Sequence, residues 1–157
     1  MGKEAITAVN HWRGQCLDNF ARAERAIIAA FDVAPISLLD NRPNLHESAG
    51  QRTRNLRQAI NQNWPANPIA MKAVSRLQNW SLREKQRNNL VHGRFTVKGN
   101  GNENWTVVNE TVEIKKGVPV KAQTPIAMLE AEAFLQAIIA ERKELEAALV
   151  GLRSVKP

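Results

Sequence analysis

Apolar residues recur at alternating intervals of three and four along the first 31 residues, and this spacing strongly restricts the fold. The seam runs through Ile6, Val9, Arg13, Cys16, Phe20, Ala23, Ile27 and Ala30, with Arg13 as its one interruption. A period of about 3.6 residues per turn places these positions on one side of a helix. We therefore expect a long helix over residues 4–31 that buries this seam against partner helices.

Capping residues in the middle of the chain predict further helices. A second helix is expected over residues 49–64. A third is expected to begin at Asn67-Pro68, because asparagine is a good N-cap and proline suits the first helical position. Ser81-Leu82-Arg83-Glu84 has the pattern of a capping box and predicts a fourth helix that starts there. Gly93 is expected to end that helix.

After this helix the pattern changes to strands. Residues 94–98 alternate polar and apolar side chains, Gly99-Asn100-Gly101-Asn102 predicts a turn, and residues 105–115 are rich in Thr and Val. Thr124-Pro125 is expected to cap a last helix that runs to residue 149. The sequence therefore predicts a mainly α fold in one domain, residues 1–157. This fold is an up-and-down bundle of four to five helices, with a small β-hairpin or meander at residues 94–121 before the last helix.

Charge and cysteine content restrict the partners and the compartment. The chain has 22 Lys and Arg against 15 Asp and Glu, a formal net charge of +7, which favours anionic partners and nucleic acid first. A basic protein without such a partner is the alternative. No stretch approaches the roughly 18 apolar residues of a membrane span. The single cysteine, Cys16, excludes an internal disulfide and favours the cytoplasm. Its place on the apolar seam predicts a buried side chain rather than a nucleophile.

The segment Arg87-Asn88-Asn89-Leu90-Val91-His92-Gly93 carries the candidate chemistry. Helical geometry places Asn88 and His92 on one face, and the long Arg87 side chain can swing to the same rim. RNA cleavage without a metal needs a proton-transfer group, a cation for the phosphate and a group that orients the substrate. The segment supplies all three types, with His92 for proton transfer, Arg87 for the phosphate and Asn88 for orientation of the substrate. The alternative is a structural role in which His92 complements the dipole at the helix C-terminus.

In this setting the segment resembles the HEPN superfamily of helical domains, whose motif has four to six residues between an arginine and a histidine. Arg87, Asn88 and His92 match the arginine, the polar residue after it and the histidine, with the shortest spacing. One branch of the superfamily has a motif of the form RN-x-L-x-H-G. The chain is similar to this branch in two further features, a β segment after the motif and a last helix that starts at Thr124-Pro125.

The resemblance implies a function. Many HEPN domains are endoribonucleases that need no metal or other cofactor, leave 2′,3′-cyclic phosphate ends and act in toxin–antitoxin, abortive-infection or other defence systems. Their motifs meet across a dimer interface, so the resemblance implies a homodimer that acts on RNA. It also implies an antitoxin or a nucleotidyltransferase as a separate protein partner. Five arginines are candidates to extend the RNA-binding surface: Arg52, Arg54, Arg57, Arg83 and Arg94.

Two other functions fit the same residues. Some HEPN domains do not cleave, so a non-catalytic module that binds a nucleotide, RNA or a protein is the main alternative. A helical scaffold without a nucleic-acid role is the other. Solvent access distinguishes these functions, because catalysis requires Arg87 and His92 in one accessible cleft. Of the tryptophans, Trp64 and Trp80 are expected in the core, and Trp105 is the best candidate for an exposed aromatic side chain.

Overall fold

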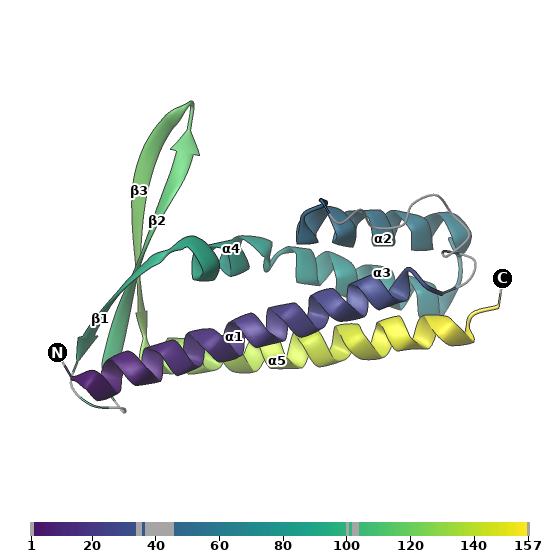
Figure 1. The fold of residues 1–157 in the computed structure, drawn as a ribbon. Helices are drawn as coiled ribbons and strands as arrows, with labels where there is room; N and C mark the ends of the chain where they lie inside the picture. The colour runs from purple at the N-terminus through teal and green to yellow at the C-terminus, as the bar shows by residue number, and fades with distance from the viewer. Residues whose placement is uncertain (1, 34–35, 37–45, 100, 102–103, 157) are drawn as a thin grey trace. The chain divides into compact units, whose positions relative to one another are not determined.

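A computed structural model of the chain describes residues 2–33, 36, 46–99, 101 and 104–156. The fold is mainly helical, with a small antiparallel sheet before the last helix, so the predicted fold class is confirmed. Asn100 and Asn102 of the predicted turn lie outside the described residues. The elements in chain order are α1 (Lys3–Ala30), α2 (Ala49–Asn63), α3 (Pro68–Ser81), α4 (Glu84–His92), β1 (Arg94–Gly99), β2 (Trp105–Lys115), β3 (Val118–Ala127), α5 (Met128–Gly151) and a 3-10 turn, η2 (Leu152–Ser154) (Figure 1).

The contacts divide the chain into two compact units, and each of them is described by itself. The sheet unit consists of Met1–Asp18 and Lys85–Ile138, and the helical unit consists of Asn19–Glu84 and Ile139–Pro157. The boundaries fall inside α1 and α5 and after Glu84, the first residue of α4, so α1 and α5 contribute long segments to both units.

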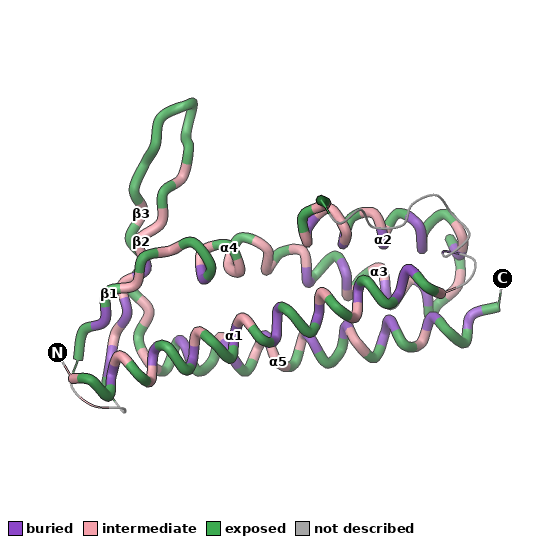
Figure 2. Tube along the Cα trace, viewed as in Figure 1, coloured by how far each residue is buried: buried purple, intermediate pink, exposed green. Residues whose placement is uncertain are grey.

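The predicted seam on α1 is confirmed over most of its length. Its buried positions are Ala5, Val9, Trp12, Cys16, Phe20, Ala23, Ile27 and Ala30 (Figure 2). The spacing of three and four is kept throughout, but Ala5 and Trp12 take the places that were expected for Ile6 and Arg13. The seam is therefore continuous, and Arg13 lies beside it rather than in it.

The helical unit packs segments of four helices around a common core. Phe20 of α1 and Trp80 of α3 have ring centroids 5.3 Å apart. Arg142 of α5 donates from Nε to Asn19 Oδ1 of α1 at 2.7 Å, which satisfies two buried polar side chains. Side chains with almost no exposed surface fill the space between the helices, among them Leu56, Ile60, Leu77, Leu145 and Leu152.

The sheet unit contains the three strands in the order β1-β2-β3, all antiparallel. β1 pairs with only the first half of β2, from Gly99 opposite Trp105 to Arg94 opposite Glu110. β2 and β3 continue beyond β1 as a two-stranded hairpin (Figure 1). Most residues of this extension are exposed (Figure 2), including Val112, Ile114 and Val118 at 59–68% exposure.

The predicted start of the fourth helix is wrong. Ser81 is the last residue of α3, and its hydroxyl donates to the carbonyl oxygen of Gln78 at 2.6 Å instead of capping the next helix. α4 begins at Glu84. Packing of Trp80 in the core of the helical unit accounts for the difference, because it keeps α3 helical past the predicted capping position.

The predicted start of the last helix is also wrong. Thr124 and Pro125 lie in β3, where Thr124 is paired with Asn109, and the β segment extends to Ala127 rather than to residue 121. α5 begins at Met128, and Glu130 Oε2 accepts the N–H of Ala127 at 2.9 Å. Strand pairing with β2 therefore overrides the local capping pattern, and one of the features that supported the family resemblance is absent.

Trp105 is buried, in contrast to the expectation that it is exposed. It occupies the inward face of β2 together with Val107 and Asn109. Its ring centroid lies 6.1 Å from that of Trp12, whose indole N–H donates to the Ala131 carbonyl oxygen at 2.8 Å. The predicted burial of Trp64 and Trp80 is confirmed.

Candidate functional site

The predicted motif lies on α4, whose C-terminal end is held by Arg13 of α1. The Arg13 Nε donates to the carbonyl oxygen of Leu90 at 2.7 Å, and Nη2 donates to that of Val91 at 3.1 Å. The guanidinium also lies over the ring of Phe95, 4.6 Å from its centroid. Carbonyl groups at a helix C-terminus carry partial negative charge, so this cation satisfies and stabilises them. Arg13, which lies beside the apolar seam, thus positions the motif helix.

α4 ends at Gly93, where glycine is required because a Cβ atom has no space, and not because the backbone is left-handed. Its N–H donates to the Asn89 carbonyl oxygen at 2.9 Å, and Asn109 Nδ2 donates to the same oxygen at 3.3 Å. A Cβ atom at position 93 would overlap both Asn109 Oδ1 and that carbonyl. Gly93 is not among the described glycines with positive φ, namely Gly99, Gly101 and Gly117. The close approach of Asn109 therefore requires glycine here.

Asn88 and His92 share one face of α4, as predicted, and line the same hollow of about 370 Å³. Arg94 of β1 and Glu110 of β2 line it too, and Val112 of β2 lies at its wall. We call this the His92 hollow. The side chains of Asn88, His92 and Arg94 are exposed, so a solvent-borne ligand has access to them.

Arg87 is not among the residues that line the His92 hollow. Its side chain is half-buried, and Nη1 donates to Asn88 Oδ1 at 3.4 Å. In this conformation Arg87 contacts the Asn88 amide, which lines the hollow. Direct contact of Arg87 with a phosphate stays a prediction.

Glu110 adds a carboxylate that the sequence reasoning missed. Gln123 Nε2 donates to Glu110 Oε2 at 3.0 Å, and Lys121 Nζ lies 4.0 Å from Oε1. The hydrogen bond from Gln123, followed by the charges of Lys121 and Arg94, lowers the pKa of Glu110, so this group is ionised at neutral pH. The structure places Arg94 opposite Glu110 across the strands, and this pairing depends on the register between β1 and β2.

The five candidate RNA-binding arginines do not all lie in one unit. Arg94 lines the His92 hollow of the sheet unit, and the others belong to the helical unit: Arg52, Arg54, Arg57 and Arg83. Arg83 Nε donates to Glu141 Oε2 at 2.9 Å, and this hydrogen bond raises the pKa of Arg83. Arg52 forms an ion pair with Glu24. Binding of RNA by these four side chains stays a prediction.

Cys16 is buried, as predicted, and its burial raises the thiol pKa to about 12. The thiolate is the reactive form of cysteine, so this side chain is not a nucleophile at neutral pH. In the part of the chain that the structure describes, no group of three or more His, Cys, Asp or Glu side chains could hold a metal ion.

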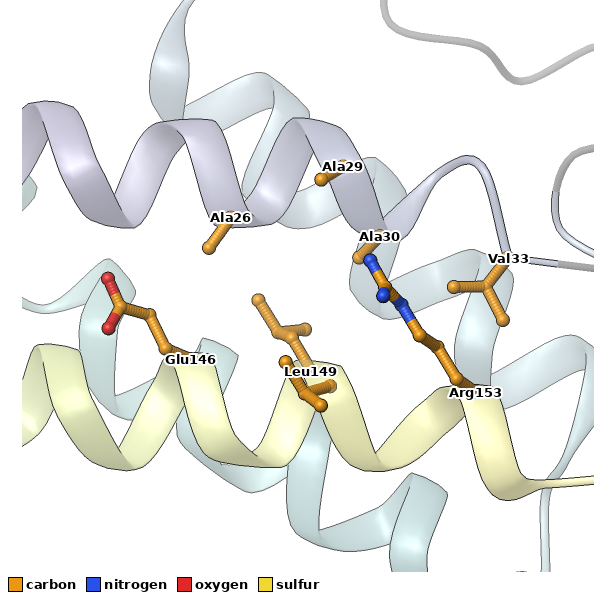
Figure 3. Close-up of a pocket in the computed structure, with 8 residues that line it drawn as sticks. Ala26, Ala29, Ala30, Val33, Glu146, Leu149 and Arg153 are labelled. Atoms are coloured by element: carbon orange, nitrogen blue, oxygen red, sulfur yellow. The ribbon is translucent and has the colours of Figure 1, made fainter.

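Two other hollows are present among the described residues. One lies in the sheet unit on the other side of Asn89, has a volume of about 280 Å³ and is lined in part by Trp12 and Phe134. The other lies in the helical unit, between the end of α1 and the C-terminal part of α5, and has a volume of about 290 Å³. Figure 3 shows that alanine and valine side chains face Leu149 across it, with Glu146 and Arg153 at its two ends. It contains none of the predicted functional residues.

Comparisons of the chain with protein-family models, with curated proteins and with solved structures found no match. Among the described helices, none combines the length and the apolar character that crossing a membrane requires. The residues of the site are therefore the basis for assigning a function.

Proposed function

We propose that this protein is a HEPN-like endoribonuclease that cleaves RNA without a metal ion by attack of the 2′-hydroxyl on the adjacent phosphate. The observation that supports this most is the His92 hollow, where an exposed imidazole, an amide and a cation lie on neighbouring elements. Its volume of about 370 Å³ is within the usual range for a small-ligand site. The products are a 2′,3′-cyclic phosphate and a 5′-hydroxyl.

The residues of the hollow divide the chemistry between them. His92 moves protons, because an imidazole has one nitrogen that can donate a proton and one that can accept it. Arg94 is a permanent cation that can bind two phosphate oxygens at once and stabilise the charge that develops on them. Asn88 orients the substrate, and Arg87 orients Asn88 through the hydrogen bond to its Oδ1.

Cleavage of this kind requires both a base for the 2′-hydroxyl and an acid for the leaving oxygen, and the chain offers two sources. One is a pair within a single chain, His92 as the acid and the ionised Glu110 as the base, since both line the same hollow. The other is a homodimer that brings two copies of His92 together, as the resemblance implies. Glu110 is a weak base because of its lowered pKa, so its contribution depends on its position.

Incubation of the purified protein with tRNA and total RNA in excess EDTA tests the proposal. We expect cleavage that EDTA does not inhibit, with cyclic phosphate at the 3′ ends of the products. Denaturing gels and end-group analysis by mass spectrometry measure both. Absence of cleavage under these conditions, or 3′-hydroxyl ends, contradicts the proposal.

Glu110→Gln distinguishes the two sources of the base. If Glu110 is the base, the cleavage rate is expected to fall by about a hundredfold or more, which is the usual effect of losing a general base. The amide keeps the size of the side chain, and one oxygen still accepts from Gln123. A cleavage rate equal to that of the wild type assigns both proton transfers to histidines of two copies. Glu132→Gln, at an exposed position on α5, is the matched control.

The same proposal includes a biological setting. The protein acts in the cytoplasm as a toxin or as part of a phage-defence system, and a separate antitoxin or nucleotidyltransferase is its partner. These statements follow from the resemblance of the α4 motif.

The alternative function, a module that binds a nucleotide, RNA or a protein without cleavage, is favoured by one observation, the aromatic hollow on the other side of Asn89.

A further inference from the structure

The second hollow of the sheet unit lies next to the motif helix but faces away from His92. We call it the Trp12 hollow. Asn89 lines both hollows, while the neighbouring β2 residues Asn109 and Glu110 line one each. Successive side chains of a strand point to opposite faces, so the Trp12 hollow belongs to the other face of the sheet. Its cross-strand wall is formed by Asn109 and its partner Thr124.

Aromatic rings form the apolar part of the Trp12 hollow. The ring centroids of Trp12 and Phe134 are 6.4 Å apart, with an angle of 58° between their planes. Trp12 is buried and is held by its hydrogen bond to the Ala131 carbonyl, whereas Phe134 is half-buried and presents the more exposed ring. A fixed aromatic surface is what proteins use to stack planar heteroaromatic rings such as nucleobases.

The polar part of the hollow consists of amides, a hydroxyl and one carboxylate. Asn109 is 5% exposed, and its Oδ1 is packed against Gly93, which does not line the hollow. Glu130 is exposed at the hollow, where Oε2 accepts from the Ala127 N–H. Within the described residues, no donor is bonded to its Oε1.

The charge of the lining selects the kind of ligand. No lysine or arginine lines the Trp12 hollow, and its one ionisable side chain is the acidic Glu130. A phosphate is therefore disfavoured inside it, whereas a neutral ring that presents N–H donors is favoured. The volume of about 280 Å³ is just below the usual range for ligand sites, which suits a single base rather than a longer chain.

We propose that the Trp12 hollow binds a guanine base, stacked on the aromatic side chains and read by the Glu130 carboxylate. Guanine presents two adjacent N–H donors, N1–H and the 2-amino group, and a carboxylate accepts such a pair with its two oxygens. Asn89 and Asn109 face the remaining polar edge. This binding does not depend on cleavage at the His92 hollow, so it stands or fails separately from the nuclease activity.

Titration with nucleosides tests this proposal, because a nucleoside has no phosphodiester to cleave. Guanosine is compared with inosine, which lacks only the 2-amino group, and with uridine. Isothermal titration calorimetry measures the Kd, and the NMR signal of the Trp12 indole N–H reports the location. We expect guanosine to bind about tenfold more tightly than inosine, which is the usual effect of one hydrogen bond to a charged group, and more tightly still than uridine.

Variants assign the preference to named side chains. Glu130→Gln keeps an oxygen for the Ala127 N–H but has only one acceptor, so guanosine is expected to lose its tenfold advantage over inosine. Phe134→Leu is expected to weaken both nucleosides by about tenfold through lost stacking. Glu132→Gln, two residues away and exposed, is expected to bind like the wild type. No binding of guanosine, equal binding of all three nucleosides, or an unchanged preference in Glu130→Gln overturns the proposal.

Discussion

His92→Ala is expected to lower the rate of RNA cleavage by at least about a hundredfold, the usual loss when a general acid or base is removed. The imidazole is exposed on the last turn of α4 and lines the hollow together with Asn88 and Arg94. Because the side chain is exposed, the urea midpoint of unfolding is expected to stay close to that of the wild type. Initial rates on a labelled RNA in EDTA and an equilibrium unfolding curve measure the two effects.

His11→Ala is the matched control for this experiment. His11 is exposed on α1 and does not line the His92 hollow, so this variant is expected to cleave RNA at the rate of the wild type. Equal loss of activity in both histidine variants, or a wild-type rate in His92→Ala, removes His92 from the mechanism. A contaminating nuclease would give a wild-type rate in His92→Ala, because its activity does not depend on His92.

Gly93→Ala is expected to destabilise the fold by about 1–3 kcal/mol, the usual cost of overpacking. The new methyl group would overlap Asn109 Oδ1 and the Asn89 carbonyl oxygen. Relief requires Asn109 to move, which breaks its hydrogen bond to Asn89 and disturbs the junction of α4 with β1. Urea unfolding followed by circular dichroism measures the change in the free energy of unfolding. Cleavage is expected to fall as well, because His92 precedes this junction directly.

Gly14→Ala is the control, and its expected effect has the opposite sign. Gly14 is exposed in the interior of α1, and a Cβ atom there has no neighbour within 4 Å. Alanine in place of glycine inside a helix stabilises by about 0.5–1 kcal/mol. If Gly93→Ala leaves stability unchanged or raises it, the close approach of Asn109 does not explain why α4 ends at this glycine.

The helices were predictable where a long apolar pattern or a local cap determines them. The seam lies on α1, a helix of 28 residues. The N-cap Asn67 accepts hydrogen bonds from the N–H groups of Ile69 and Ala70, as expected for its position before Pro68. The two wrong helix starts depend instead on long-range contacts. Ser81 and Thr124 have side chains that suit an N-cap, but packing keeps Ser81 in α3, and pairing with β2 keeps Thr124 in β3. Such contacts are invisible in a local window.

The candidate site was predictable in its helical part only. The spacing of Asn88 and His92 determines that they share a face, and the structure places them in one hollow. The contributions from other elements were missed, namely Arg13 from α1 and Glu110 from β2. Arg13 was read as a defect of the apolar seam, since its partners are backbone carbonyls 77 and 78 residues away. Glu110 required the strand register, which depends on the turn before β2.

Among the described residues, the order of the strands leaves the outer side of β3 without a neighbouring strand. An open strand beside exposed valine and isoleucine side chains is a template for the addition of further strands and hence for fibrous aggregation. β3 carries Pro119 and Pro125, which are an even number of residues apart and therefore both lack an N–H on the same side. The N–H of Ala127, at the same parity, is taken by Glu130. The open edge thus offers an interrupted row of donors, which opposes uncontrolled polymerisation of the chain while the hairpin stays exposed.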